Sequence, residues 1–496
     1  MSKRKVVINA LAALLQSVLT GVSLFILYKF LIFSLGADSF GIWSLVMAFS
    51  SFAQFANLGL SGTVVKYVAG HIARGDTHKA AEVIQTAAIS IFTITGVIVF
   101  FAEPVLEMVL PLFIAGYPLA QATELLPWAL LSFWLMAMAA VFLSALDGYF
   151  CVVLKSSILV LVSVLNLLLC LYTVPVYGVK GVAYSTVFAN FIALLFGWIA
   201  IRNKNVELPA IPYKWRKAVF LEIIGYAGSF QLISIAGMFG ESIIKAFLGK
   251  FGSLASVGYY EMATRLVLQI RGLLISAYQV LVPFLANLNE RDPGKVMHVY
   301  RKAYSLLYYL AFPVFLLLAI SMPLVSIIWI GYVDELFVFL GRLVVLGWFL
   351  NTLAVPAYVL SLGLGDLRWN VRGHALTALL NIGFGYLGGV FFGISGVVAA
   401  AVVSLVLGSI LISIPVTLSR GVSISEYIPA DSRGMTLLLS LLLFMAIPSQ
   451  DRLQIMGGLV PHAVFAAIAV LVGMAIVYRH PMRGYIMDSF FAAFRK

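Results

Sequence analysis

Residues 165–182 read LNLLLCLYTVPVYGVKGV, and residues 380–397 read LNIGFGYLGGVFFGISGV. Both stretches contain a Leu-Asn pair followed by a Gly-x-x-Gly-Val corner, at the same spacing. Matched positions lie 215 residues apart, and they include Asn166 with Asn381, Gly178 with Gly393, Gly181 with Gly396, and Gln16 with Gln231. This repetition predicts that the chain contains two copies of one structural unit, residues 1–215 and 216–430.

Composition indicates that the chain is an integral membrane protein. Hydrophobic residues make up 62% of the sequence and charged residues only 10%. Apolar runs of about eighteen or more residues are typical of membrane-spanning helices. The fold class is therefore all-α integral membrane, with about fourteen transmembrane helices. The predicted spans are 8–33, 40–62, 81–102, 125–145, 156–175, 181–200, 219–247, 257–287, 303–322, 343–362, 374–390, 396–416, 435–447 and 456–477.

The distribution of basic residues predicts the orientation. With the N-terminal MSKRK in the cytoplasm, most of the 32 Lys and Arg residues fall in cytoplasmic segments. This is the positive-inside pattern, and it places both termini in the cytoplasm. The expected location is the cell (inner) membrane, which the chain crosses several times. The net charge of +12 then reflects topology and contact with anionic headgroups, and nucleic acid is not expected as a partner. The two cysteines, Cys151 and Cys170, do not suggest a disulfide framework.

Each copy has six predicted spans, so both copies enter the membrane in the same orientation. Parallel repeats of this kind occur in transporters, where the substrate site lies between the halves. Residues 431–496 match neither copy, and they add two helices and a basic cytoplasmic tail. The polar stretch RNKNVELPAIPYKWRK, residues 202–217, is the expected cytoplasmic linker.

Charged residues within the predicted spans are the candidate functional residues. A charge at the centre of a span costs about 2.5–3.5 kcal/mol on insertion scales, so each requires a partner or a water-filled cavity. Glu241 with Lys245 and Glu261 with Arg265 are spaced i, i+4 with the acid first, which favours an ion pair on one helix face. Such pairs are either structural or coupling sites for H⁺ or Na⁺. Arg271 has no acidic residue within a helical turn, which makes it the strongest candidate for lining a cavity.

Lys29 lies in the first helix of the first copy at about the depth of Lys245 in the second. It either extends to the headgroups or lines the same cavity. Together, Lys29, Lys245, Arg265 and Arg271 would outnumber Glu241 and Glu261, and the resulting basic cavity would favour a phosphate or pyrophosphate. Four glutamines could supply neutral donors and acceptors for sugar hydroxyls: Gln16, Gln231, Gln54 and Gln269.

Three stretches carry a resemblance to a known family: LGADSFGIWSLVMAF (35–49), FANLGLSGTVVKYVAGHIARGD (55–76) and LASVGYYEMATRL (254–266). Their order resembles the oligosaccharide-lipid flippases of the multidrug/oligosaccharidyl-lipid/polysaccharide (MOP) exporter superfamily, Wzx-like polysaccharide-transport branch. In that pattern the second stretch leads into a basic first cytoplasmic loop. Many members carry a basic residue near the first Leu-Gly corner, where this chain has Ile32 and Phe33.

The resemblance implies a V-shaped pair of six-helix bundles, alternating access and a polyprenyl-pyrophosphate-linked oligosaccharide as substrate, for synthesis of O-antigen, capsule or exopolysaccharide. It also implies cavity roles for the six charged residues named above, with a polysaccharide polymerase and chain-length proteins as candidate partners. A lipid II flippase and an ion-coupled multidrug antiporter of the same superfamily remain alternatives. A membrane-embedded polysaccharide enzyme is disfavoured, because the six His are scattered and no phosphate-binding Gly-x-x-x-x-Gly-Lys loop occurs. We expect no catalytic residues, cofactor or metal.

Overall fold

The computed structural model describes residues 3–51, 60–276, 278, 281–419, 424–456 and 459–484. Within these ranges every regular element is a helix, which confirms the predicted all-α class. Nine segments of the described chain are long and apolar enough to cross a membrane. Each predicted span coincides with helix wherever it is described, apart from a turn at Leu353 and Ala354, while the count of fourteen spans stays a prediction. The chain divides into two compact units, residues 1–258 and 259–496.

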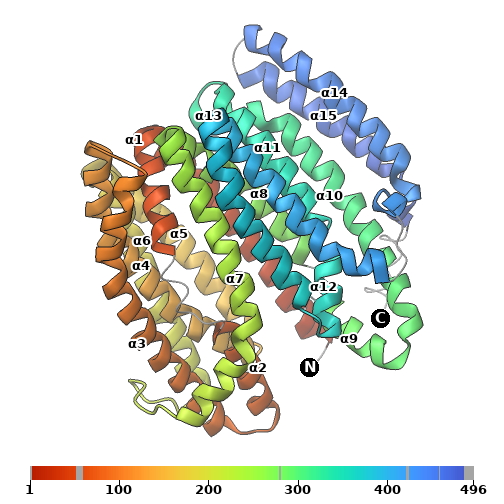
Figure 1. The fold of residues 1–496 in the computed structure, drawn as a ribbon. Helices are drawn as coiled ribbons and strands as arrows, with labels where there is room; N and C mark the ends of the chain where they lie inside the picture. Colours follow the sequence, from red (N-terminus) through yellow and green to blue (C-terminus); the bar gives the residue numbers. More distant parts are fainter. Residues whose placement is uncertain are drawn as a thin grey trace. The chain divides into compact units, whose positions relative to one another are not determined.

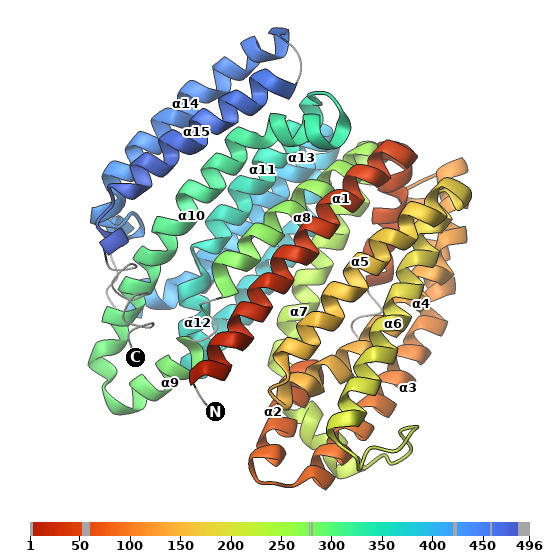
Figure 2. The same ribbon diagram turned by 180° about the vertical axis from the view of Figure 1, so that it is seen from behind.

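The first unit is a bundle of long helices (Figures 1 and 2). Its elements are α1 (Lys3–Ser50), α2 (Leu60–Ala73), α3 (Thr77–Val109), η2 (Leu110–Leu112), α4 (Tyr117–Gly148), α5 (Val152–Tyr177), α6 (Val179–Lys204), α7 (Lys217–Phe251) and the start of α8 (Leu254–Ser276). Residues 63–73, expected to belong to the first cytoplasmic loop, instead form most of the helix α2. It packs closely on α4, where a Cβ on Gly148 would lie 2.8 Å from the Cβ of Val68. Small residues permit such close packing in membrane proteins.

The second unit contains the remaining helices. Its elements are the rest of α8, α9 (Leu281–Arg291), α10 (Pro293–Ile330), α11 (Glu335–Thr352), α12 (Val355–Leu364), α13 (Arg368–Ser419), η4 (Ile424–Tyr427), η5 (Ala430–Ser432), α14 (Arg433–Met456) and α15 (Leu459–Tyr478). Figures 1 and 2 both show α14 and α15 side by side next to α10. The predicted span 343–362 is divided into α11 and α12, because Pro356 lies in the first turn of α12 and cannot donate a backbone hydrogen bond to a preceding helix.

The repeated corner adopts one conformation in both copies. Gly178 has φ 57° and ψ −136°, and Gly393 has φ 58° and ψ −139°. Side chains with a Cβ rarely adopt such positive φ values, so glycine is required at both positions. A Cβ on Gly181 would lie 2.5 Å from the carbonyl oxygen of Thr173, and one on Gly396 would lie 2.6 Å from the carbonyl carbon of Gly388. The corner therefore packs the paired helices backbone to backbone.

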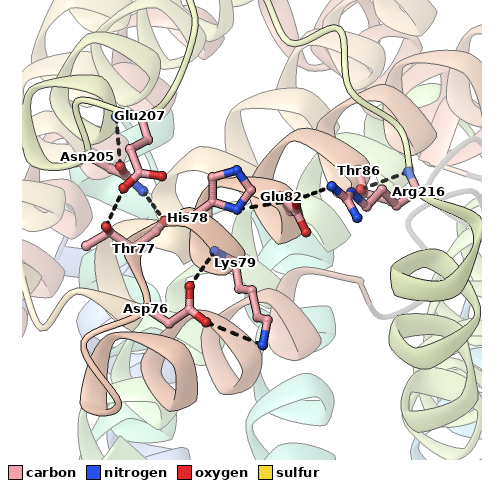
Figure 3. A network of polar contacts seen from close by, with 9 residues as sticks. All are labelled: Asp76, Thr77, His78, Lys79, Glu82, Thr86, Asn205, Glu207 and Arg216. Carbon is pink, nitrogen blue, oxygen red and sulfur yellow. Dashed lines mark hydrogen bonds and ion pairs between the residues drawn. The ribbon is translucent and has the colours of Figure 1, made fainter.

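The linker that follows α6 is attached to the start of α3 (Figure 3). Asn205 donates to the carbonyl oxygen of Thr77 at 2.9 Å, and the Thr77 hydroxyl donates to Glu207 at 2.7 Å. Asp76 caps α3 by accepting from the backbone N–H of Lys79 at 2.9 Å. This hydrogen bond lowers the pKa of Asp76 below its usual value. The turn before α3 thus holds the first residues of the linker.

The end of the linker is attached one to three turns further along α3. Gln85 accepts from the backbone N–H groups of residues 213 and 214, and Thr86 accepts from that of Arg216 at 3.4 Å. Glu82, whose side chain is 10% exposed, lies between His78 and Arg216, and its carboxylate is 2.6 Å from the Arg216 guanidinium (Figure 3). Because α7 begins at the next residue, Lys217, this contact fixes the start of α7 against α3. The boundary predicted for the sequence repeat at residue 215 remains a prediction.

Candidate functional site: a guanidinium held by neutral groups

Two ion pairs form at the spacing that the sequence predicted. On α7, Lys245 Nζ lies 2.9 Å from Glu241 Oε1, and the Lys245 side chain is 3% exposed. On α8, Arg265 Nε lies 2.7 Å from Glu261 Oε1, and here the acid is the buried partner at 9% exposed. Each buried charge thus has an opposite charge one turn away. These four groups compensate one another, whatever further role they have.

Arg271 on α8 is bound in a different way. Its Nε donates to Thr352 Oγ1 at 3.2 Å, and its Nη2 donates to Asn351 Oδ1 at 2.9 Å. The guanidinium carbon lies 5.1 Å from the centre of the Trp348 ring, within the range of a cation–π interaction. These three α11 residues are spaced i, i+3, i+4 and therefore share one helix face. One face of α11 thus holds the guanidinium through two hydrogen bonds and one ring contact.

A further layer of hydrogen bonds orients these partners. Asn351 Nδ2 donates to Ser409 Oγ on α13 at 2.8 Å, which directs its carbonyl oxygen toward Arg271. The Ser409 hydroxyl in turn donates to the carbonyl oxygen of Leu405 at 2.7 Å. The Thr352 hydroxyl donates to the carbonyl oxygen of Trp348 at 2.6 Å, so its lone pairs face the Arg271 N–H. The network connects α8, α11 and α13 and fixes the guanidinium in place.

The partners of Arg271 carry no negative charge. Among the residues that the structure describes, no carboxylate forms an ion pair with it. An amide, a hydroxyl and an indole ring orient the guanidinium but leave its full positive charge in a helix bundle of a membrane protein. Ionised groups at such depth are costly and are typical of substrate or ion pathways. Arg271 therefore has a fixed position and a positive charge that no described carboxylate neutralises.

The other predicted residues fall in different surroundings. Lys29 on α1 is exposed, and no ion pair to it occurs within the described chain, in contrast to its buried counterpart Lys245. Gln16 is half-buried on α1, and its backbone carbonyl accepts from Thr20 at 2.8 Å. Gln231 belongs to α7, but its side chain lies outside the described residues, as does all of Gln54. Gln269 is half-buried on α8. A common cavity would draw on both units, and it stays a prediction.

Sequence reasoning missed the groups that hold Arg271. The signal was the sequence WFLNT, residues 348–352, in which an indole, an amide and a hydroxyl share one face of an otherwise apolar helix. Ser409 carried no signal that distinguishes it from the other serines of the spans. In the described part of the chain, no cluster of three or more His, Cys, Asp or Glu could hold a metal ion.

Comparison with protein families places this site in context. The family model of the polysaccharide biosynthesis proteins matches residues 34–331, which contain α7, α8 and Arg271. The chain belongs to the polysaccharide biosynthesis protein family. No curated protein sequence matches the chain.

Solved structures of a flippase and of two transporters share the fold of this chain. The lipid II flippase MurJ in an inward closed conformation aligns with a TM-score of 0.71 at 12% identity, over 95% of this chain and 99% of MurJ. An inward-facing multidrug resistance MATE family transporter aligns with a TM-score of 0.61 at 18% identity, over 84% and 96%. A MOP superfamily transporter from Pyrococcus furiosus aligns with a TM-score of 0.57 at 18% identity, over 82% and 95%. At 12–18% identity, these matches show that the chain shares the fold of these membrane proteins.

Proposed function

We propose that this protein is a flippase that moves a polyprenyl-pyrophosphate-linked oligosaccharide from the cytoplasmic to the outer leaflet of the cell membrane, for surface polysaccharide synthesis. The observation that supports this substrate class is the uncompensated guanidinium of Arg271. Both chain termini would then lie in the cytoplasm, as the positive-inside pattern predicts.

The donors of Arg271 suit a phosphate group. Arg has N–H donors on two edges of its planar guanidinium. The side edge, formed by Nε and Nη2, is used by Thr352 and Asn351. The end-on edge, formed by Nη1 and the second N–H of Nη2, donates to no acceptor in the described chain. Two parallel N–H groups bind phosphate oxygens bidentately, so this edge would receive one phosphate of the substrate.

The remaining charged residues would extend this contact. Lys29, Lys245 and Arg265 would add positive charge along the path of the pyrophosphate, and Gln16 and Gln231 would bond to sugar hydroxyls. The polyprenyl tail stays in the lipid while the two halves alternate between inward and outward access. Glu241 and Glu261 are the candidate sites for H⁺ or Na⁺ coupling, and a polymerase and chain-length proteins would receive the product.

A lipid II flippase is the second candidate, because the fold likeness to MurJ covers nearly the whole chain. Its substrate carries the same pyrophosphate, so Arg271 does not distinguish the two glycans. A multidrug antiporter is less well supported, since a cationic drug would be repelled by a guanidinium that no described carboxylate compensates.

Transport by the full chain in proteoliposomes tests the proposal. Fluorescent polyprenyl-pyrophosphate-linked oligosaccharide, lipid II and a cationic dye are supplied to separate vesicles, and a membrane-impermeant quencher reports translocation. We expect translocation of the oligosaccharide lipid, with a loss of about tenfold or more in Arg271→Gln. Arg368→Gln is the matched control, because Arg368 binds Asp366 on an exposed surface.

Transport of the cationic dye alone would contradict the proposal, and transport of lipid II alone would favour the second candidate.

In cells, deletion of the gene should trap the lipid-linked oligosaccharide in the inner leaflet. Replacement of Glu241 by Gln should abolish dependence on an ion gradient; unchanged dependence would leave Glu241 as the structural partner of Lys245.

A further inference from the structure

A cavity separate from the Arg271 network lies between α10 and the start of α14. Its volume is about 210 Å³. All of its walls belong to the second unit, and they include Tyr300 and Tyr304 of α10, Glu426 and Tyr427 of η4, Asp431 of η5 and Arg433 of α14. The sequence places these residues on the predicted cytoplasmic side, near the ends of two spans. The cavity is therefore expected at the level of the inner-leaflet headgroups.

Three tyrosines form the aromatic part of this cavity. The rings of Tyr300 and Tyr304 have centroids 6.3 Å apart, and those of Tyr304 and Tyr427 are 5.9 Å apart and edge-to-face. The Tyr304 hydroxyl donates to the carbonyl oxygen of Tyr427 at 3.0 Å. Tyr300 is only 4% exposed, yet its hydroxyl bonds to no group in the described chain. This hydroxyl is not among the fully buried polar atoms that lack a partner, and since Tyr300 lines the cavity, the hydroxyl is accessible to a ligand there.

The cavity contains charges of both signs. Arg301 Nε lies 2.8 Å from Glu426 Oε2, so these two charges compensate each other. Arg433 and Asp431 form no ion pair within the described chain. One cation and one anion that form no ion pair within the described chain thus line the same cavity beside aromatic rings. A purely anionic ligand would meet the carboxylate of Asp431, and a purely cationic ligand would meet the guanidinium of Arg433.

We infer that this cavity binds a phosphoethanolamine group, in the form of the headgroup of a phosphatidylethanolamine molecule of the inner leaflet. Arg433 and the Tyr300 hydroxyl would donate to the phosphate oxygens. The ammonium would donate to Asp431 and lie against the tyrosine rings, which attract cations. A phosphate and an ammonium joined by two carbons match the two opposite charges of the cavity. This site is independent of the proposed transport substrate and would anchor α14 to α10.

Lipid binding to the full-length protein tests the inference. The delipidated protein in detergent is titrated with phosphatidylethanolamine, phosphatidylglycerol or phosphatidylcholine, and bound lipid is counted by native mass spectrometry. We expect phosphatidylethanolamine to bind about tenfold or more tightly than the other two. Phosphatidylglycerol lacks the ammonium, and phosphatidylcholine lacks the N–H donors for Asp431. Equal affinity for the three lipids would overturn the inference.

Variants locate the binding. Tyr300→Phe, Arg433→Gln and Asp431→Asn should each reduce the preference for phosphatidylethanolamine, whereas Arg368→Gln should leave it unchanged. Tyr300→Phe keeps the ring and removes only the hydroxyl, so a lost preference in a variant with unchanged thermal stability is diagnostic. An unchanged preference in all three variants would overturn the site.

Soluble O-phosphoethanolamine distinguishes the two sources of this headgroup. Weak competition that depends on the same three residues would assign the site to the lipid. Competition as strong as that of phosphatidylethanolamine would keep the headgroup chemistry and overturn the lipid as its source.

Discussion

Replacing the second glycine of each corner by alanine should destabilise the protein by a calculable amount. At Gly181 the added Cβ would lie 2.5 Å from the carbonyl oxygen of Thr173, and at Gly396 it would lie 2.6 Å from the carbonyl carbon of Gly388. Both distances fall well below van der Waals contact, and both neighbours are backbone atoms that cannot rotate away. Overpacking of this kind typically costs about 1–3 kcal/mol. Gly383→Ala is the matched control, since an added Cβ there meets no atom within 4 Å.

The control should be neutral or stabilising, because alanine is favoured over glycine within a helix by about 1 kcal/mol. Apparent melting temperature in detergent, measured by the loss of monodisperse protein after heating, ranks the variants. We expect Gly383→Ala to melt at or above the wild type, and Gly181→Ala and Gly396→Ala to melt below it. The first corner glycines, Gly178 and Gly393, should be at least as sensitive, since positive φ values cost alanine about 1–3 kcal/mol.

Equal melting temperatures for Gly396→Ala and Gly383→Ala would refute the close backbone packing at the corner. A loss at Gly396 without a loss at Gly181 would refute the equivalence of the two copies, because the structure gives both corners the same geometry. The comparison therefore tests the duplication that the sequence repeat predicts.

Two further predictions concern contacts near the ends of helices. Glu82→Gln should weaken the attachment of the linker at Arg216 by about 1 kcal/mol, because the Glu82–Arg216 ion pair is partly exposed. Limited trypsin digestion should then cleave the linker faster. An unchanged cleavage rate would contradict the attachment. His480 lies 3.0 Å from Ser432 Oγ and accepts from the backbone N–H of Met482 at 3.1 Å, and its pKa is lowered, chiefly by burial, although Asp431 opposes the shift. Because His480 takes up a proton more readily in the unfolded protein, the folded protein should lose stability as pH falls below about 6.5. Hydrogen exchange in α15 should then become faster. His480→Gln should abolish this pH dependence, and a pH dependence that persists in the variant would contradict the role of His480.

The spans could be predicted because an apolar run long enough to cross the bilayer is visible in the sequence itself. The recurrence of the corners could be predicted because glycines lie at matched positions 215 residues apart, whereas their positive φ values came from the structure. The division of 343–362 could not be predicted: α11 ends at Thr352 and α12 begins at Val355, within a continuous apolar stretch. The helix α2 was missed because its basic residues, such as Lys66, indicated only the side of the membrane.

Arg271 could be predicted as a candidate because an unpaired charge in an apolar run is rare. Asn351, which binds Arg271, and Ser409, which binds Asn351, could not be predicted, because they come from helices that are distant in sequence and carry no charge. The ion pairs on α7 and α8 were predicted because both partners lie on one helix. Interactions within one helix are thus visible in the sequence, whereas contacts between helices require the fold.

The most direct test of the account measures how tightly the protein binds a pyrophosphate. A short-chain isoprenyl pyrophosphate and the matching monophosphate are titrated into detergent-solubilised wild type, Arg271→Lys and Arg271→Gln, and the dissociation constants are determined by calorimetry. We predict that Arg271→Gln weakens pyrophosphate binding about 10- to 100-fold, the loss expected for hydrogen bonds to a charged group, and that Arg271→Lys, which keeps the charge but loses the paired N–H edge, is intermediate. Equal dissociation constants for all three proteins would contradict the claim that Arg271 recognises the substrate.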